Sequence, residues 1–265
     1  MAININESLS AEHVCIAADT GGGKTAAVKL LGVCGDCVAI FDLYGNYRFD
    51  GRKGKVNKFN GLGGREVFTF HDRKSFSKAF ISAWRSGKKF VLAYNPVSQK
   101  PLNQKEMLEF RRQELDFFGG LMWAALDGKR KLYIAIEELA KLVSTTGKDS
   151  SIIGEIATGG RAFGGVLVTV FQRKQEVPKT IWNMSPNKII GALDTKADIK
   201  AMNEATDAPI ECLNHVSKLN AKYKAQFLHY IIKSAGFGNV SAKRVSLKAP
   251  FKVDNLALDE FLLLK

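Results

Sequence analysis

Residues 16 to 25 read Ile16-Ala17-Ala18-Asp19-Thr20-Gly21-Gly22-Gly23-Lys24-Thr25. The apolar run Val14–Ala17 leads into this stretch and predicts a buried strand, and Lys24–Leu31 predicts a helix that stops at Gly32. Glycines between a strand and a helix let backbone N–H groups curl around an anion, and the helix directs its positive end toward the same point. The stretch therefore predicts a phosphate-binding loop.

The Lys-Thr pair makes this prediction more specific. In the pattern G-x-x-x-x-G-K-[ST], the lysine reaches the β- and γ-phosphates of a nucleotide and the next hydroxyl holds Mg²⁺. Ala18 stands where the pattern begins with Gly, which is a mild departure because Ala is small. The alternative, a glycine-rich turn without a ligand, leaves the Lys-Thr pair unexplained. We expect ATP to be bound by Asp19, Thr20, Gly21, Gly22, Gly23, Lys24 and Thr25.

Two carboxylates follow a second apolar run, Leu132–Ile136. If this run is a parallel strand, Glu137 and Glu138 emerge at the sheet edge that carries the phosphate loop. ATP hydrolysis needs one acidic group near Mg²⁺ and one group that orients the attacking water. We assign Glu137, together with Thr25, to Mg²⁺ and Glu138 to the water. Asp is the common residue at the first position, and an acid-rich helix N-terminus is the alternative interpretation.

Short apolar runs alternate with helical stretches along the chain. Seven runs predict strands: Val14–Ala17, Val38–Phe41, Phe90–Tyr94, Leu132–Ile136, Val166–Phe171, Lys188–Leu193 and Phe227–Ile232. Helices are predicted over Lys24–Leu31, Ser75–Arg85, Gln104–Leu126 (with a break at Gly119-Gly120) and Ile152 to about Ala162. This alternation predicts the α/β class: a doubly wound, mostly parallel P-loop NTPase (RecA-like) sheet with helices on both faces.

Composition limits the classes of function. The 265 residues carry a net charge of +13, which favours a polyanionic partner, with nucleic acid first and an anionic membrane surface second. A generally basic enzyme is the alternative. No apolar run approaches the roughly 18 residues needed to span a bilayer, and the first ten residues lack the features of a signal peptide. We therefore expect no transmembrane segment and a cytoplasmic protein.

Residues 1–265 are expected to form a single P-loop ATPase domain with a basic C-terminal segment from about residue 212. Cys212–Val253 contains eight Lys or Arg and no Asp or Glu, and is a candidate phosphate-contacting surface or a solvated basic face. Tyr47–Gly64, rich in Gly, Asn, Lys and Arg, predicts a loop or hairpin. Cys34 and Cys37 form a CxxC without a second pair, so we expect small buried residues rather than a zinc or redox site.

Three further segments resemble the FtsK–HerA superfamily of P-loop ATPases. Ala39–Tyr47 looks like the D-x-x-G-[EN]-[YF] turn after the second strand of that family. Gly159–Gly165, the strand Val166–Phe171 and Gln172-Arg173 are similar to its G-R…G-[strand]-Q-R segment. Thr180–Met184, Lys188–Leu193 and Asp198 resemble the element that follows. The resemblance covers roughly residues 14 to 235.

The resemblance implies roles for three more residues. The family's glutamine at the end of this strand senses the γ-phosphate, which assigns that role to Gln172. An arginine before the strand reaches the ATP of the neighbouring subunit, which implies that Arg161 acts in trans, with Arg173 as the second candidate. A cation there would stabilise charge in the transition state. A surface or DNA-facing arginine is the alternative for Arg161.

The family's motor is a ring, often a hexamer, that moves double-stranded DNA. The short stretch before Val14 and the lack of a predicted anchor make the chain most similar to the genome-packaging ATPases of tailless, membrane-containing, double-jelly-roll viruses. Such a protein would work in the host cytoplasm or on the virion and dock on a capsid vertex or membrane protein. A plasmid or cellular translocase, and a nucleotide-dependent switch or scaffold, are the alternatives. DNA contacts in the pore are expected among Arg48–Lys58 or Lys218–Lys252.

Overall fold

A ten-stranded sheet runs through the part of the chain that the structure, a computed structural model, describes: residues 5–48, 57–143, 146–223, 225–248 and 251–265. The strand order is β10-β9-β8-β7-β1-β6-β5-β2-β4-β3. The strands are β1 (Val14–Ala17), β2 (Cys37–Phe41), β3 (Val67–Phe70), β4 (Phe90–Tyr94), β5 (Leu132–Ile136), β6 (Gly165–Phe171), β7 (Asn187–Ile190), β8 (Phe227–Lys233), β9 (Val240–Ser246) and β10 (Val253–Leu256). Strands from β3 to β7 in this order are parallel, and β8, β9 and β10 continue the sheet as an antiparallel ribbon.

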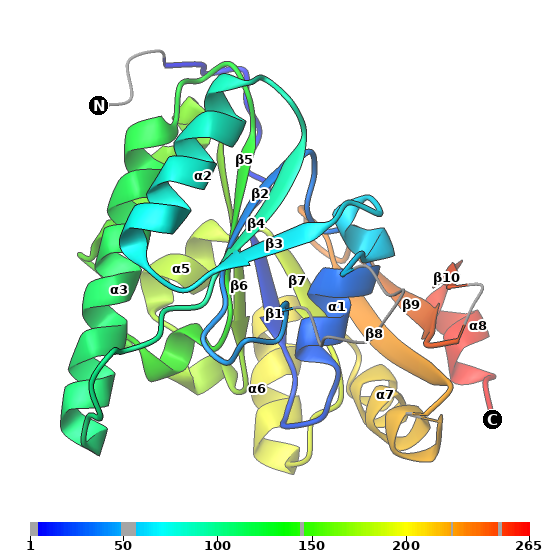
Figure 1. Cartoon of the computed structure of the whole chain (residues 1–265). Helices are drawn as coiled ribbons and strands as arrows, with labels where there is room; N and C mark the ends of the chain where they lie inside the picture. Colours follow the sequence, from blue (N-terminus) through cyan, green and yellow to red (C-terminus); the bar gives the residue numbers. More distant parts are fainter. Residues whose placement is uncertain (1–4, 49–56, 144–145, 224, 249–250) are drawn as a thin grey trace.

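Helices cover both faces of the sheet, but unequally (Figure 1). They are α1 (Lys24–Leu30), α2 (Arg73–Arg85), α3 (Gln104–Ala125), α4 (Ile152–Gly159), α5 (Lys179–Met184), α6 (Lys196–Thr206), α7 (Ile210–Tyr223) and α8 (Leu258–Leu262). Helices α2 to α8 contribute to one buried cluster, with Phe80, Phe118 and Phe261 among its fully buried side chains. Helix α1 packs on the opposite face through Ala27 and Val28. The predicted doubly wound α/β sheet is confirmed.

The strand order brings four segments to one edge of the sheet. Strand β6 lies between β1 and β5, with Ala17 beside Phe171 and Ile136 beside Thr169. Strand β2 follows on the other side of β5, with Phe41 beside Ile136. Because these strands are parallel, the residues that follow each one meet at the same edge. The sheet therefore gathers the phosphate loop, the glutamate pair and the residues after β2 and β6.

The seven expected strands are present with small changes at their ends. The expected strand Lys188–Leu193 already ends at Ile190. Strands β3, β9 and β10 were not expected, because their residues are half exposed and carry polar or charged side chains. Most of the expected excursion Tyr47–Gly64 and of the candidate DNA contacts Arg48–Lys58 lies outside the described residues, which omit 49–56.

The expected break at Gly119-Gly120 is wrong, since α3 is continuous through both residues. A Cβ at position 119 would lie 2.6 Å from Ile152 and 2.9 Å from Ile153. Gly119 therefore serves close packing of α3 on α4, rather than a kink. No helix among the described residues is long and apolar enough to cross a membrane.

The cysteines are free and buried. Burial raises the pKa of the Cys34 thiol to about 12 and also raises that of Cys37. A thiol with a raised pKa is a weak nucleophile and a poor metal ligand. Both residues therefore pack as small apolar side chains, as the sequence predicted.

Candidate nucleotide-binding site

The loop between β1 and α1 has a curled backbone, and the Lys24 side chain folds back against it. Gly21 and Gly23 have φ of 76° and 95°, conformations that a side chain disfavours. The Lys24 ammonium folds back and donates to the carbonyl oxygens of Ala18 at 3.0 Å and Asp19 at 3.1 Å. Burial lowers the pKa of Lys24, and nearby Glu138 opposes that shift. The loop therefore holds a partly desolvated cation beside its backbone N–H groups.

Glu137 lies beside Thr25 as the sequence predicted. The Thr25 hydroxyl donates to Glu137 Oε2 at 3.0 Å, and the Tyr47 hydroxyl donates to Oε1 at 2.6 Å. The Glu137 side chain is buried, and burial raises its pKa to about 7 against the lowering effect of the two hydroxyls. The raised pKa means that ionising Glu137 costs free energy in the empty site, and that a nearby cation would reduce this cost.

The pair of a hydroxyl and a carboxylate fits Mg²⁺. This ion prefers oxygen ligands and keeps most of its positions for water and phosphate, so one or two protein groups suffice. No cluster of three or more His, Cys, Asp or Glu that could hold a metal is found in the described part of the chain. Thr25 and Glu137 are thus the residues that would hold Mg²⁺ next to a bound phosphate.

Glu138 is the point where three other groups converge. Its carboxylate lies 3.8 Å from the Lys24 ammonium and 3.7 Å from that of Lys141, and it accepts a hydrogen bond from Gln172 Nε2 at 3.4 Å. The Glu138 backbone has φ 54° and ψ 42°, a left-handed conformation that is uncommon for residues other than glycine. Such local strain is typical of functional positions. It turns the Glu138 side chain toward the phosphate loop.

The turn after β2 positions a residue that sequence reasoning did not assign. The Asp42 carboxylate accepts from the backbone N–H groups of Asn46 and Tyr47, both at 2.8 Å, and Asn95 donates to the Asp42 carbonyl at 2.7 Å. This cap fixes the path of the turn, so that Tyr47 reaches Glu137. The D-x-x-G-N-Y pattern was the available signal, but it did not say what the tyrosine contacts.

A pocket of about 560 Å³ opens beside the phosphate loop, and Glu137 and Tyr47 lie outside its lining. Its lining residues are Thr20, Gly21, Gly23, Lys24, Thr25, Ala26, Tyr44, Asn46, Glu138, Gln172 and Leu228. Asp19, although expected to bind the nucleotide, accepts a hydrogen bond from the backbone N–H of Asp194 and is not part of the lining. Gly22 also lies outside the lining, where a Cβ would meet Ala18 and the Asp19 carbonyl at 2.9 Å.

Solved structures share the fold that carries this pocket. The genome packaging NTPase B204 from Sulfolobus turreted icosahedral virus 2, in complex with sulfate, has a TM-score of 0.56 at 13% identity, over 87% of this chain and 94% of that chain. The DNA-packaging ATPase B204 from Sulfolobus turreted icosahedral virus has a TM-score of 0.53 at 14% identity, over 86% and 95%. VirB4 of Thermoanaerobacter pseudethanolicus has a TM-score of 0.52 at 10% identity, over 92% and 88%. The chain shares its fold with these three proteins. No protein-family model matches the chain, and no curated protein matches it in sequence.

Within this fold, the two candidate trans-acting arginines lie at opposite edges of the sheet. Arg161 precedes β6, at the edge away from the pocket, and its guanidinium donates to the Leu9 carbonyl. Arg173 follows β6 and lies 3.8 Å from Asp198. Neither arginine lines the pocket of its own chain.

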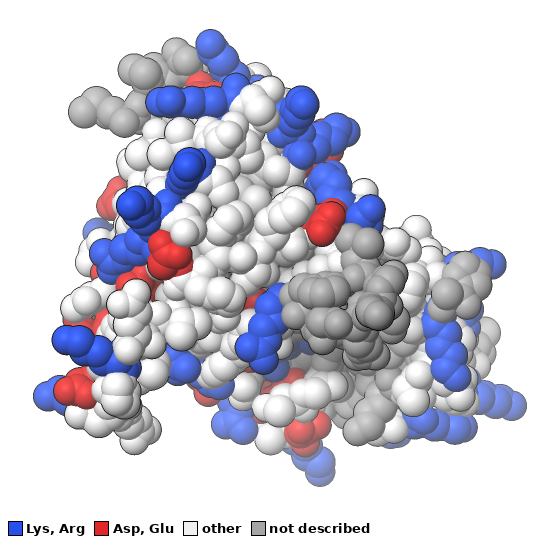
Figure 2. Space-filling view, in the orientation of Figure 1, with Lys and Arg blue, Asp and Glu red and all other residues white. Residues whose placement is uncertain are grey.

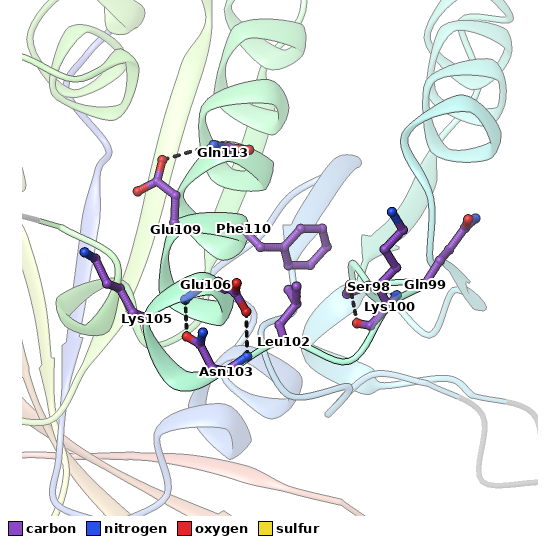
Figure 3. Close-up of a pocket in the computed structure, with 10 residues that line it drawn as sticks. All are labelled: Ser98, Gln99, Lys100, Leu102, Asn103, Lys105, Glu106, Glu109, Phe110 and Gln113. Carbon is purple, nitrogen blue, oxygen red and sulfur yellow. Dashed lines mark hydrogen bonds between the residues drawn. The ribbon is translucent and has the colours of Figure 1, made fainter.

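A second hollow, of about 710 Å³, lies at the beginning of α3 and has no part in this chemistry (Figure 3). Leu102 and Phe110 lie side by side in it, between Lys105 on one side and Lys100 on the other. Asn103 and Glu106 form a capping box that starts the helix. Asn103 and Glu106 are already hydrogen-bonded to each other's backbone, so this hollow lacks a cluster of charged groups like the one around Glu138.

Proposed function

We propose that this chain is an ATPase that moves double-stranded DNA, and that it packages a viral genome. The observation that carries the proposal is the meeting of Lys24, Thr25, Glu137, Glu138 and Gln172 at one sheet edge. A protein that only binds a nucleotide needs the phosphate loop, but it needs neither a second carboxylate nor a glutamine that contacts it. The two B204 proteins, described as packaging a genome or DNA, match this chain over nearly their whole length.

We assign a task to each of these groups. Lys24 and the loop N–H groups hold the β- and γ-phosphates, and Thr25 with Glu137 holds Mg²⁺, which neutralises phosphate charge when bound. Glu138 orients the attacking water after a phosphate has drawn Lys24 away from it. Gln172 contacts Glu138 directly, so loss of the γ-phosphate would be felt at the end of β6.

A further cation near the γ-phosphate would stabilise the charge of the transition state. We assign it to Arg161 of a neighbouring subunit, with Arg173 as the alternative, which requires a homo-oligomeric ring such as a hexamer. Residues 1–265 act in this ring as one motor domain. The motor would work in the host cytoplasm or on the virion, docked on a capsid vertex or a membrane protein.

A second setting is favoured by the likeness to VirB4. That fold is shared at a similar TM-score, so a plasmid or cellular translocase would use the same pocket with a different docking partner. A nucleotide-dependent switch or scaffold is the remaining alternative, and it predicts slow hydrolysis that DNA does not change.

Steady-state ATP hydrolysis with and without double-stranded DNA tests the proposal. Wild type should be stimulated by DNA of any sequence, and Glu138→Gln should bind ATP but hydrolyse it at least about a hundredfold more slowly. Glu155→Gln, which changes an exposed glutamate on α4, is the matched control and should behave as wild type. Hydrolysis that ignores DNA, alone and with the capsid protein present, would leave the switch as the better reading.

A further inference from the structure

The hairpin between β8 and β9 presents a bare aromatic ring. Lys233 pairs with Val240 at the end of the ladder, and residues 234–239 form the tip. Phe237 at this tip is 92% exposed, more than any other large hydrophobic side chain among the described residues. Gly236 and Gly238 flank it with φ of 98° and 66°. A single exposed apolar residue is usually unremarkable, so its surroundings decide whether it has a use.

The tip is held rigid by its own hydrogen bonds. Ser234 N–H donates to the Asn239 carbonyl at 3.0 Å, and the Asn239 amide donates to the Ala235 carbonyl at 3.2 Å. The Lys233 ammonium donates to the carbonyls of Ser234, at 2.7 Å, and of Gly236. The ring is therefore presented by an ordered tip that has already lost its conformational entropy, which favours binding of a partner.

The ribbon that carries the tip is basic and unneutralised. Lys233 ends β8, and Lys243 lies on β9. In the described part of the chain neither of these two lysines has a carboxylate within ion-pair distance, whereas Arg244 pairs with Asp254 at 2.8 Å. Basic side chains also gather on the visible surface where β9, β10 and α8 lie (Figure 2). The charge selects a polyanion over an apolar partner.

Strand β8 also connects this tip to the phosphate loop. Leu228 near its start lines the nucleotide pocket, and the Tyr230 hydroxyl donates to the Gly23 carbonyl at 2.8 Å. Four residues further along the same strand the tip begins, about 13 Å away at strand spacing. One strand thus joins the contact with the phosphate loop to the tip.

We propose that the β8–β9 tip is a DNA contact, in which Phe237 enters the minor groove while the neighbouring lysines hold phosphates. Apolar side chains act as wedges in that groove, where the pattern of the base pairs is degenerate, so such a contact depends little on the sequence of the DNA. The inference rests on the proposed function, because it names the surface by which that motor grips DNA. Strand β8 then couples the grip to the nucleotide.

Binding of the full chain to a fluorescent duplex of mixed sequence, measured across a range of salt concentrations, tests this contact. Phe237→Ala should weaken binding about tenfold, the size of one aromatic contact with a base, without changing the slope of log affinity against log salt. Lys243→Gln should instead reduce that slope by about one. Phe237→Trp should retain affinity and report duplex addition through its own emission. Leu263→Ala, at another exposed apolar residue, should bind as wild type.

The outcomes separate this inference from the function on which it rests. If wild type binds DNA and is stimulated by it while Phe237→Ala does the same, the tip is not a DNA contact and the proposed function stands. If wild type neither binds DNA nor responds to it, the proposed function fails first. Two further measurements apply if Phe237→Ala keeps its affinity for DNA. Loss of its binding to vesicles of phosphatidylglycerol and phosphatidylcholine would reassign Phe237 to a membrane contact. A change in its assembly size, measured by light scattering, would reassign Phe237 to a contact with a neighbouring subunit.

Discussion

Replacing Glu137 with Gln should stabilise the nucleotide-free protein at alkaline pH while abolishing ATP turnover. Glu137 is 1% exposed, and burial raises its pKa from an ordinary 4.5 to about 7. That difference of about 2.5 pKa units corresponds to about 3 kcal/mol, at about 1.4 kcal/mol for each unit. Because the folded protein holds this proton more tightly than the unfolded chain, the stabilisation is present below about pH 4.5 and is lost as the pH rises to about 7. Gln cannot ionise, so the variant escapes the loss.

Urea unfolding at pH 5 and pH 8, without Mg²⁺ or nucleotide, measures this effect. The free energy of unfolding of the variant, relative to wild type, should increase by about 2–3 kcal/mol between the two pH values. Asp19, whose pKa is also raised by burial, remains in both proteins and cancels in the comparison. Asp42 interacts electrostatically with Glu137, so its own titration also responds to the substitution. Glu155→Gln should show no such change. Parallel pH profiles for Glu137→Gln and wild type would refute the reasoning.

Three other substitutions test the pocket. Lys24→Ala removes the buried cation and should abolish binding of a fluorescent ATP analogue at every Mg²⁺ concentration; normal turnover would exclude the phosphate-loop assignment. Tyr47→Phe keeps the ring but deletes the donor 2.6 Å from Glu137, a loss of about 1–3 kcal/mol. It should raise the Mg²⁺ concentration needed for half-maximal nucleotide binding by about tenfold, and an unchanged Mg²⁺ requirement would remove the hydroxyl from the site. Mixing Arg161→Ala subunits into wild type should depress activity more than in proportion to their fraction, and a linear response would remove Arg161 from catalysis.

The sequence predicted the parts of the site in which chemistry and local structure coincide. Lys24 and Thr25 are adjacent in a strand-loop-helix pattern, and Glu137 follows a fully apolar strand end, so both could be recognised from neighbours in the chain. The contact between Tyr47 and Glu137 joins residues 90 positions apart, and it depends on the order of β2 and β5 in the sheet. That order is a tertiary property, which no local pattern contains.

The antiparallel ribbon β8 to β10 also contains strands that could not be predicted from local sequence. Strand β9 reads Val-Ser-Ala-Lys-Arg-Val-Ser, in which Ala242 and Val245 are the buried residues. They are three positions apart and so point to opposite faces, which obscures the alternation expected of a strand with one buried face. The charge of this segment was evident from the sequence, but its pairing with β8 was not. Phe237 therefore looked like one more loop residue until the ladder placed it at a tip.

The sheet changes from parallel to antiparallel at β7, and this junction has an evolutionary consequence. The proposed reaction uses groups in the segments that follow the parallel strands β1, β5 and β6, whereas the ribbon β8 to β10 is attached at one edge of the parallel sheet. A lineage could therefore exchange the ribbon to suit a new cargo while inheriting the chemistry unchanged. The replacement would have to retain a hydroxyl within reach of the Gly23 carbonyl, as Tyr230 provides now. Without that contact, the new ribbon would not respond to changes in the phosphate loop.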